Sequence, residues 1–243
     1  MRPAFLIYLQ PQMITPIQNP LQNPSIELLG LRIDEPVTTI TDIIVALIGI
    51  WGYFKIAKGK NHKHVSIYAY FFLGTGISTF IAGLLGHAFL YRFGYEIKMV
   101  GWVLGILGTC FAQFAAVHHA KQTIGEKAFK TLLAICYLEV IVSMTILILK
   151  PSFMVVICHT AFGLIGMVTI LESINYSRTK SKLSLMMIYG VGLAVLAIIS
   201  HTCKIAVSKW FNHLDVSHVF LGLSIYVMIK GVLYEQKNNP VTT

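Results

Sequence analysis

The sequence predicts an all-α fold: a polytopic membrane protein, built as a seven-transmembrane-helix bundle with no soluble domain. The chain of 243 residues is 56% hydrophobic and only 12% charged, whereas an average soluble domain is about 25% charged. Its mean hydropathy is +0.71. Apolar stretches of about 20 residues, the length that crosses a bilayer as a helix, recur along the chain. They lie at 37–55, 67–90, 99–118, 131–149, 153–172, 184–203 and 214–232.

The remaining residues form two short terminal segments. Residues 1–35 contain no long apolar run, and the stretch 10–25 is rich in Pro, Gln and Asn, which predicts an irregular extracytoplasmic segment. Residues 36–233 are the predicted transmembrane bundle, and 234–243 are a predicted cytoplasmic tail. The connections between apolar stretches are short, so we expect consecutive helices to pack antiparallel.

The elements themselves carry helix signals. Pro36 suits the first position of the first helix, and Glu35 lies beside the positive end of that helix's dipole. Later helices carry glycines at spacings of three or four residues, such as Gly105 and Gly108 in 99–118 and Gly163 and Gly166 in 153–172. Small residues let membrane helices approach closely, so these glycines predict helix–helix contacts.

The basic residues predict the orientation of the bundle. Twelve of the 19 fall on one side of the predicted membrane: Lys55, Lys58, Lys60, Lys63, Lys121, Lys127, Lys130, Arg178, Lys180, Lys182, Lys230 and Lys237. Cytoplasmic loops carry the excess of Lys and Arg, so the predicted topology is N-out/C-in. The net charge of +9 is explained by this topology, and the predicted partners are membrane lipids rather than nucleic acid.

Ionisable residues interrupt the apolar helices at one predicted depth. At 1.5 Å per residue, five of them lie within roughly 3–10 Å of the outer boundary. They are Asp42, His87, His159, His201 and His218. Ionisable groups inside a bilayer are costly and usually functional, so this layer is the predicted site. Nearby, Asp215 lies three residues before His218 and shares its helix face.

The other ionisable groups are predicted to lie outside this layer. His62 and His64 fall in a basic loop and are expected to be solvated, and His118 and His119 are expected at the inner membrane interface. Glu139 lies deeper, in the middle of its helix, where it is expected to be protonated or paired because of the cost of a buried charge.

Several chemistries suit the layer. Neutral imidazoles with a carboxylate are good zinc ligands. The predicted zinc ligands are His87, His159, His201 and His218. Asp42 and Asp215 would orient ligands or act as general base. The alternatives are haem held by histidines of two helices, proton or ion movement along a chain of His and acidic residues, and a hydrogen-bond network with a structural role.

The pattern resembles a known superfamily of seven-helix membrane hydrolases, which contains the alkaline ceramidases and adiponectin receptors. The similarity consists of a histidine late in the second helix (His87), a histidine opening the last helix (His218), the N-out/C-in course and the acidic start DEPVTTITD. The resemblance implies zinc held by histidines of the second and seventh helices, and a water that attacks a lipid amide or ester.

The chain departs from the family's motifs at several positions. Gly83 stands where the family's SxxxH motif has serine, and Leu214 and Gly222 stand where HxxxH in the last helix would need a second histidine. The remaining ligands would therefore come from Asp215, His201 or His159. The resulting hypothesis is a zinc-dependent hydrolase of a lipid-like amide or ester that enters from the bilayer. The alternatives are a non-enzymatic transporter or receptor, and a haem-binding bundle.

Overall fold

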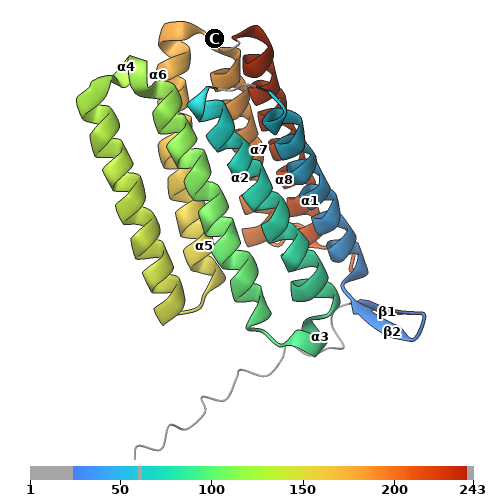
Figure 1. Ribbon diagram of the computed structural model, residues 1–243. Coiled ribbons are helices and arrows are strands. Elements are labelled where there is room, and N and C mark those ends of the chain that lie inside the picture. The colour runs from blue at the N-terminus through green and yellow to red at the C-terminus, as the bar shows by residue number, and fades with distance from the viewer. Residues whose placement is uncertain (1–23, 60–61, 240–243) are drawn as a thin grey trace, which may run out of the picture.

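The protein is a bundle of long helices that run alongside one another (Figure 1). A computed structural model describes residues 24–59 and 62–239. Its helices are α1 Pro36–Ala57, α2 Lys63–Ile81, η1 Ala82–Ala88, α3 Leu90–Phe93, α4 Ile97–Leu149, α5 Phe153–Thr160, η2 Ala161–Thr169, α6 Ile170–Thr179, α7 Lys182–Thr202 and α8 His213–Asn238. The helices account for all seven predicted apolar stretches, so the all-α prediction is confirmed for this part of the chain.

Six helices in the described residues are long and apolar enough to cross a membrane. Two of these are composite, because α2 continues through the π-helix η1 and α5 continues through η2 into α6. The six are Pro36–Ala57, Lys63–Ala88, Ile97–Leu149, Phe153–Thr179, Lys182–Thr202 and His213–Asn238. These helices indicate a multi-pass membrane protein.

The helix α4 is broken at Gly125, where φ is 81° and ψ is 165°. A straight helix of its 53 residues would be about 80 Å long, far more than a bilayer is thick. Glycine adopts a positive φ without steric cost, and in Figure 1 the two parts of α4 run in opposite directions from a turn near this point. The predicted stretches 99–118 and 131–149 occupy these two parts.

A β-hairpin precedes the first helix. Strands β1 (Ser25–Leu28) and β2 (Leu31–Asp34) pair antiparallel. The turn residues Leu29 and Gly30 both have positive φ, 52° and 76°, as a tight two-residue hairpin turn requires. The irregular segment predicted at 10–25 overlaps the hairpin only at Ser25, so the hairpin lies in residues for which the sequence predicts no secondary structure. The rest of the stretch 10–25 lies almost wholly outside the described residues.

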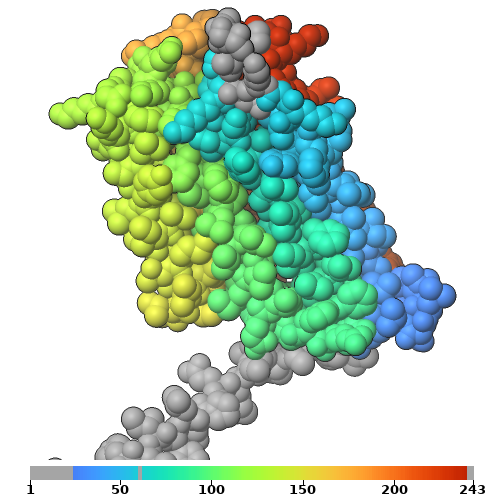
Figure 2. Space-filling view, in the orientation of Figure 1, coloured from blue at the N-terminus to red at the C-terminus, as the bar shows by residue number. Residues whose placement is uncertain are grey.

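Glycines let neighbouring helices touch through their backbones. A Cβ atom on Gly74 of α2 would lie 2.8 Å from the Cα atom of Gly108 of α4, and one on Gly49 of α1 would lie 2.6 Å from the carbonyl oxygen of Phe72. The space-filling view shows α1, α2 and the first part of α4 packed side by side (Figure 2). The packing role predicted for Gly108 is confirmed, because no larger side chain fits such a contact.

Candidate functional site

Three predicted site residues meet at the end of the bundle where β1, β2 and α3 lie, which we call the hairpin end (Figure 1). Asp42 comes from α1, His87 from η1 and His218 from α8. The Nε2 atom of His218 lies 3.3 Å from Oδ1 of Asp42, and Nε2 of His87 lies 3.9 Å from Oδ2. Asp42 is only 2% exposed. Its Oδ2 atom has no hydrogen-bond partner among the described residues, an arrangement that is costly for a buried carboxylate unless a cation or proton joins it.

The Nδ1 atoms of His87 and His218 each have a hydrogen-bond partner on the side of the ring away from Asp42. The Nδ1 atom of His87 is hydrogen-bonded to the carboxylate of Glu35. The Nδ1 atom of His218 lies 2.9 Å from Oγ1 of Thr41, which in turn lies 3.3 Å from Oδ1 of Asp215. When Nδ1–H donates outward in this way, the lone pair of Nε2 is left facing Asp42. Histidines that bind metals are oriented by such outer partners. We call Glu35, Asp42, His87, Asp215 and His218 the Asp42 cluster.

Asp215 also helps to cap the N-terminus of α8, the helix that carries His218. The backbone N–H of Leu214 donates to Oδ1 of Asn212 at 2.7 Å, and the N–H of Asn212 donates to Oδ2 of Asp215 at 2.6 Å. This reciprocal capping box starts α8 at His213. Asp215 is fully buried, and it reaches His218 only through Thr41. Its geometry is that of a residue that positions the imidazole.

The π-helix η1 carries both His87 and Gly83, and Gly83 lies against Asp42. A Cβ atom on Gly83 would lie 2.6 Å from the Cβ atom of Asp42, and the Gly83 carbonyl accepts a hydrogen bond from Oγ1 of Thr39 at 3.3 Å. Asp42 thus fills the space that a serine at position 83 would need. Single turns of π-helix inside α-helices are frequent at functional sites.

Of the other two predicted zinc ligands, His201 lies close enough to His87 and His218 to interact electrostatically with both. The ring of His201, at the end of α7, lies 5.5 Å from the ring of His213 and 5.4 Å from that of Phe153. The second, His159, is buried, with Nδ1 2.8 Å from Oε1 of Glu139 and Nε2 3.0 Å from the carbonyl oxygen of Ile106. Both nitrogens of His159 are engaged, so it belongs to a separate polar group. The expected pairing of Glu139 is confirmed.

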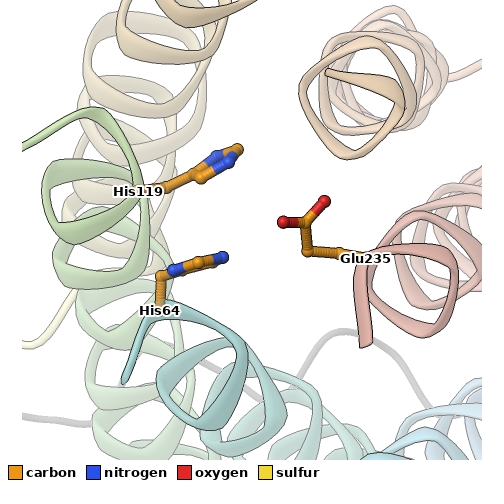
Figure 3. Close-up of side chains that lie close together, drawn as sticks. All are labelled: His64, His119 and Glu235. Atoms are coloured by element: carbon orange, nitrogen blue, oxygen red, sulfur yellow. The ribbon is translucent and has the colours of Figure 1, made fainter. Parts of the chain in front are cut away.

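A second histidine cluster lies at the opposite end of the bundle, near the end of α8 (Figure 1). His64, His119 and Glu235 present ligand atoms that all lie within 4.8 Å of one another, and Figure 3 shows the three side chains facing a common space. The prediction that His64 is solvated in a loop is wrong. The helix α2 begins at Lys63, a turn before the apolar stretch, and so directs His64 into the bundle.

A buried carboxylate orients this second cluster. Glu172 is fully buried and accepts hydrogen bonds from the hydroxyls of Tyr68 and Ser184, each at 2.6 Å. The Nδ1 atom of His119 lies 2.9 Å from Oε2 and 3.1 Å from Oε1 of the same carboxylate. His119 therefore points into the helix bundle. We call His64, His119, Glu172 and Glu235 the His119 cluster.

Sequence reasoning assigned no role to Glu172 or Glu235. One signal was present, since Glu172 and Asn175 lie three residues apart and share a face in the stretch LESIN. Glu235 lies just beyond the last apolar stretch, where a charged residue is ordinary, so its burial follows only from the length of α8.

A family model matches residues 37–237, which include both clusters apart from Glu35. It is described as a family of unknown function, DUF6962. The chain belongs to this family. No curated protein matches the chain. The matched region spans the helical bundle, and no activity is assigned to the family.

Proposed function

We propose that the protein is a zinc-dependent membrane hydrolase of a lipid-like amide or ester, with zinc bound at the Asp42 cluster. One observation carries the proposal: two imidazole Nε2 atoms converge on a buried carboxylate that lacks a hydrogen-bond partner for Oδ2 among the described residues. The resemblance to the ceramidase and adiponectin-receptor superfamily, which also uses histidines of the second and last helices, supports the same reading.

The donor atoms of Asp42, His87 and His218 would have to move closer together to hold a zinc ion. Ligand atoms about 2.0–2.1 Å from a tetrahedral zinc lie about 3.3 Å from one another. The Nε2 atom of His218 is 3.3 Å from Oδ1 of Asp42, and Nε2 of His87 is 3.9 Å from Oδ2. The two imidazoles thus approach different oxygens of Asp42, and both rings would have to move inward to share one ion. Two histidines and one carboxylate form a known catalytic zinc set with an open fourth position.

The bound ion and the residues around it would have different roles in hydrolysis. A bound zinc ion supplies Lewis acidity, which polarises a carbonyl and acidifies water. Glu35 contacts the Nδ1 atom of His87, on the side of the ring away from the ion, so it would orient this ligand and raise its basicity. Asp215 and Thr41 would hold the His218 ring in the orientation that zinc binding requires.

The position of the cluster favours a substrate that arrives from the bilayer. The outward faces of the helices around it are apolar, with exposed side chains such as Ile40 and Ile44 on α1 and Val219 and Leu223 on α8. A polar substrate would have to cross this surface, whereas a lipid-like amide or ester already lies within the bilayer. We therefore propose a lipid-like amide or ester as the substrate.

A second candidate function, proton movement, rests on the continuity of the cluster. Glu35, His87, Asp42, His218, Thr41 and Asp215 form a chain of adjacent polar side chains. Chains of acidic residues and histidines serve as proton relays in membrane proteins. This function needs no metal ion, so the metal content of the protein separates the two candidates.

We also propose seven membrane crossings with the N-terminus outside and the C-terminus in the cytoplasm. The two antiparallel parts of α4 supply two of the crossings, and the basic residues concentrate at the end opposite the Asp42 cluster. A reporter that is active only in the cytoplasm, fused after Thr243, should be active. Fused before Met1 with its own export signal, a reporter that is active only outside should also be active. The reverse pattern of activity would overturn this topology.

The zinc proposal predicts a loss of metal in single variants. The protein purified in mild detergent without chelators should lose about one equivalent of zinc on His87→Ala or His218→Ala, because removing one of three protein ligands sharply weakens binding. His118→Ala is the control, since that ring packs against Phe129 far from this cluster. A difference below about a tenth of an equivalent by elemental analysis, in both variants, would leave the proton relay as the better reading.

Hydrolysis is tested separately from metal binding. In liposomes containing fluorogenic lipid amides and esters, the wild-type protein should release product, and both the His87→Ala variant and the chelator-treated protein should lose this activity. Glu35→Gln should bind zinc about 10–100-fold more weakly, as expected when the outer partner of a histidine ligand is lost. Stoichiometric zinc without turnover of any of these lipids would contradict the hydrolase and leave the metal site standing.

A further inference from the structure

We infer that the His119 cluster is a second metal site, in which His64, His119 and Glu235 bind a divalent transition-metal ion. The three side chains come from α2, α4 and α8, and they converge at the opposite end of the bundle from the Asp42 cluster (Figure 3). The inference does not depend on the proposed hydrolase, because none of these residues belongs to that site.

The orientation of His119 leaves one nitrogen available. Its Nδ1 atom donates to Glu172, whose two oxygens also accept the Tyr68 and Ser184 hydroxyls. A carboxylate behind the imidazole orients the ring and raises its basicity as a ligand. With Nδ1 protonated, the Nε2 atom of His119 carries a lone pair.

The amide of Asn175 does not compete for that lone pair. Its Nδ2 atom lies 3.1 Å from Nε2 and 3.3 Å from Nδ1 of His119. An atom almost equally far from both ring nitrogens lies above the plane of the ring, away from the in-plane direction of either lone pair. The same amide nitrogen lies 3.2 Å from Oγ of Ser184, to which it donates.

His64 provides the independent sign of a missing ligand. Its Nε2 atom is buried without a hydrogen-bond partner among the described residues. The His64 ring stacks on that of His119, with centroids 4.5 Å apart and an interplanar angle of 24°. The two nearly parallel rings extend toward Glu235 (Figure 3). A buried nitrogen without a partner costs free energy, which coordination of an ion would recover.

Glu235 completes the set of ligands. Its side chain is buried, and Oε1 accepts a hydrogen bond from Nδ2 of Asn239 at 3.0 Å, which orients the carboxylate near the end of α8. The ligand atoms of the three residues lie within 4.8 Å of one another, compared with about 3.3 Å in a tetrahedral zinc site. Small side-chain rotations would therefore close the site.

The donor set determines the class of ion. Two imidazoles and one carboxylate, with open positions remaining, suit zinc and ferrous iron. Calcium and magnesium prefer sites made of oxygen ligands, so they are excluded as the natural occupants. An ion here would link α2, α4 and α8 at the end of the bundle opposite the hairpin.

The test measures metal in a background that lacks the first site. In the His87→Ala protein, purified without chelators, elemental analysis should find about one equivalent of zinc or iron. Adding His64→Ala, His119→Ala or Glu235→Gln should each remove most of it. His118→Ala is the matched control, because His118 adjoins His119 but packs against Phe129, with ring centroids 5.0 Å apart, and this variant should keep its metal.

A spectroscopic arm covers variants that fold poorly. Cobalt added to the metal-depleted His87→Ala protein should give the visible absorption bands of a cobalt–imidazole site, and Glu235→Gln, which conserves shape, should shift or abolish them. Metal content that is unchanged in all three cluster variants would overturn the inference, as would the absence of both metal and cobalt bands. If the His64, His119 and Glu235 variants lose metal while His218→Ala does not, the result would support the second metal site and contradict the zinc hydrolase.

Discussion

Replacing Glu172 with leucine should destabilise the bundle by about 3–5 kcal/mol, because it leaves buried partners unpaired. The carboxylate accepts hydrogen bonds from Tyr68, Ser184 and His119, and Tyr68 and Ser184 are fully buried. For a chain of this size, that loss would lower the midpoint of thermal unfolding by roughly 6–20 °C. The measurement is a thermal scan of the purified protein in detergent.

Glu126→Leu is the matched control for this change. Glu126 forms ion pairs with Lys121 at 3.2 Å and with Lys130 at 3.5 Å, but its side chain is 56% exposed. Pairs of this kind contribute little to stability, so the midpoint should stay within the error of the scan. If Glu172→Leu were equally harmless, the hydrogen-bond network around Glu172 would not be what holds α2, α4, α6 and α7 together.

Gly83→Ala should damage the Asp42 cluster although it adds only one methyl group. The new Cβ atom would lie 2.6 Å from the Cβ atom of Asp42 and 3.2 Å from the carbonyl oxygen of Thr39, so η1 has to move away from α1. Overpacking of this kind costs about 1–3 kcal/mol, and the movement would carry His87 away from Asp42. We therefore expect a lower unfolding midpoint together with the loss of about one equivalent of zinc.

A double variant separates the steric effect from the chemical one. Asp42→Gly removes the Cβ atom that Gly83→Ala would meet, so the pair should be more stable than the sum of the single changes, while zinc stays lost because Asp42 is a proposed ligand. Gly192→Ala is the control, since a Cβ atom there meets nothing within 4 Å. Additive losses in the double variant would show that the two residues do not press on each other.

The sequence predicted well at which end of its helix each ionisable residue lies. It predicted poorly which side of the helix the side chain occupies. Depth follows from counting residues at 1.5 Å each, and on that basis Asp42, His87 and His218 were correctly grouped. Whether a side chain points inward depends on helix phase, which the π-helices η1 and η2 shift. His159 was predicted to lie in the same layer, yet its ring nitrogens contact Glu139 and the carbonyl oxygen of Ile106 and not Asp42.

The His119 cluster could not be predicted for a related reason. Its members lie at helix ends, where an ionisable residue is ordinary in sequence because water and lipid headgroups are close. Only the extension of α2 back to Lys63 and of α8 forward to Asn238 brings His64 and Glu235 between the helices. These residues are buried because neighbouring helices pack against them, and local sequence patterns do not predict that packing.

The sequence by itself determined the class of this protein, its apolar helices and the hairpin-end layer of ionisable residues. It could do so because a bilayer imposes a constraint along one dimension, the length of apolar chain that spans it. The tertiary structure alone decided which ionisable residues meet, through the turn at Gly125, the close approach of Gly83 to Asp42 and the inward course of His64. Those contacts join residues up to 176 positions apart, as between Asp42 and His218, and they follow from the packing of whole helices.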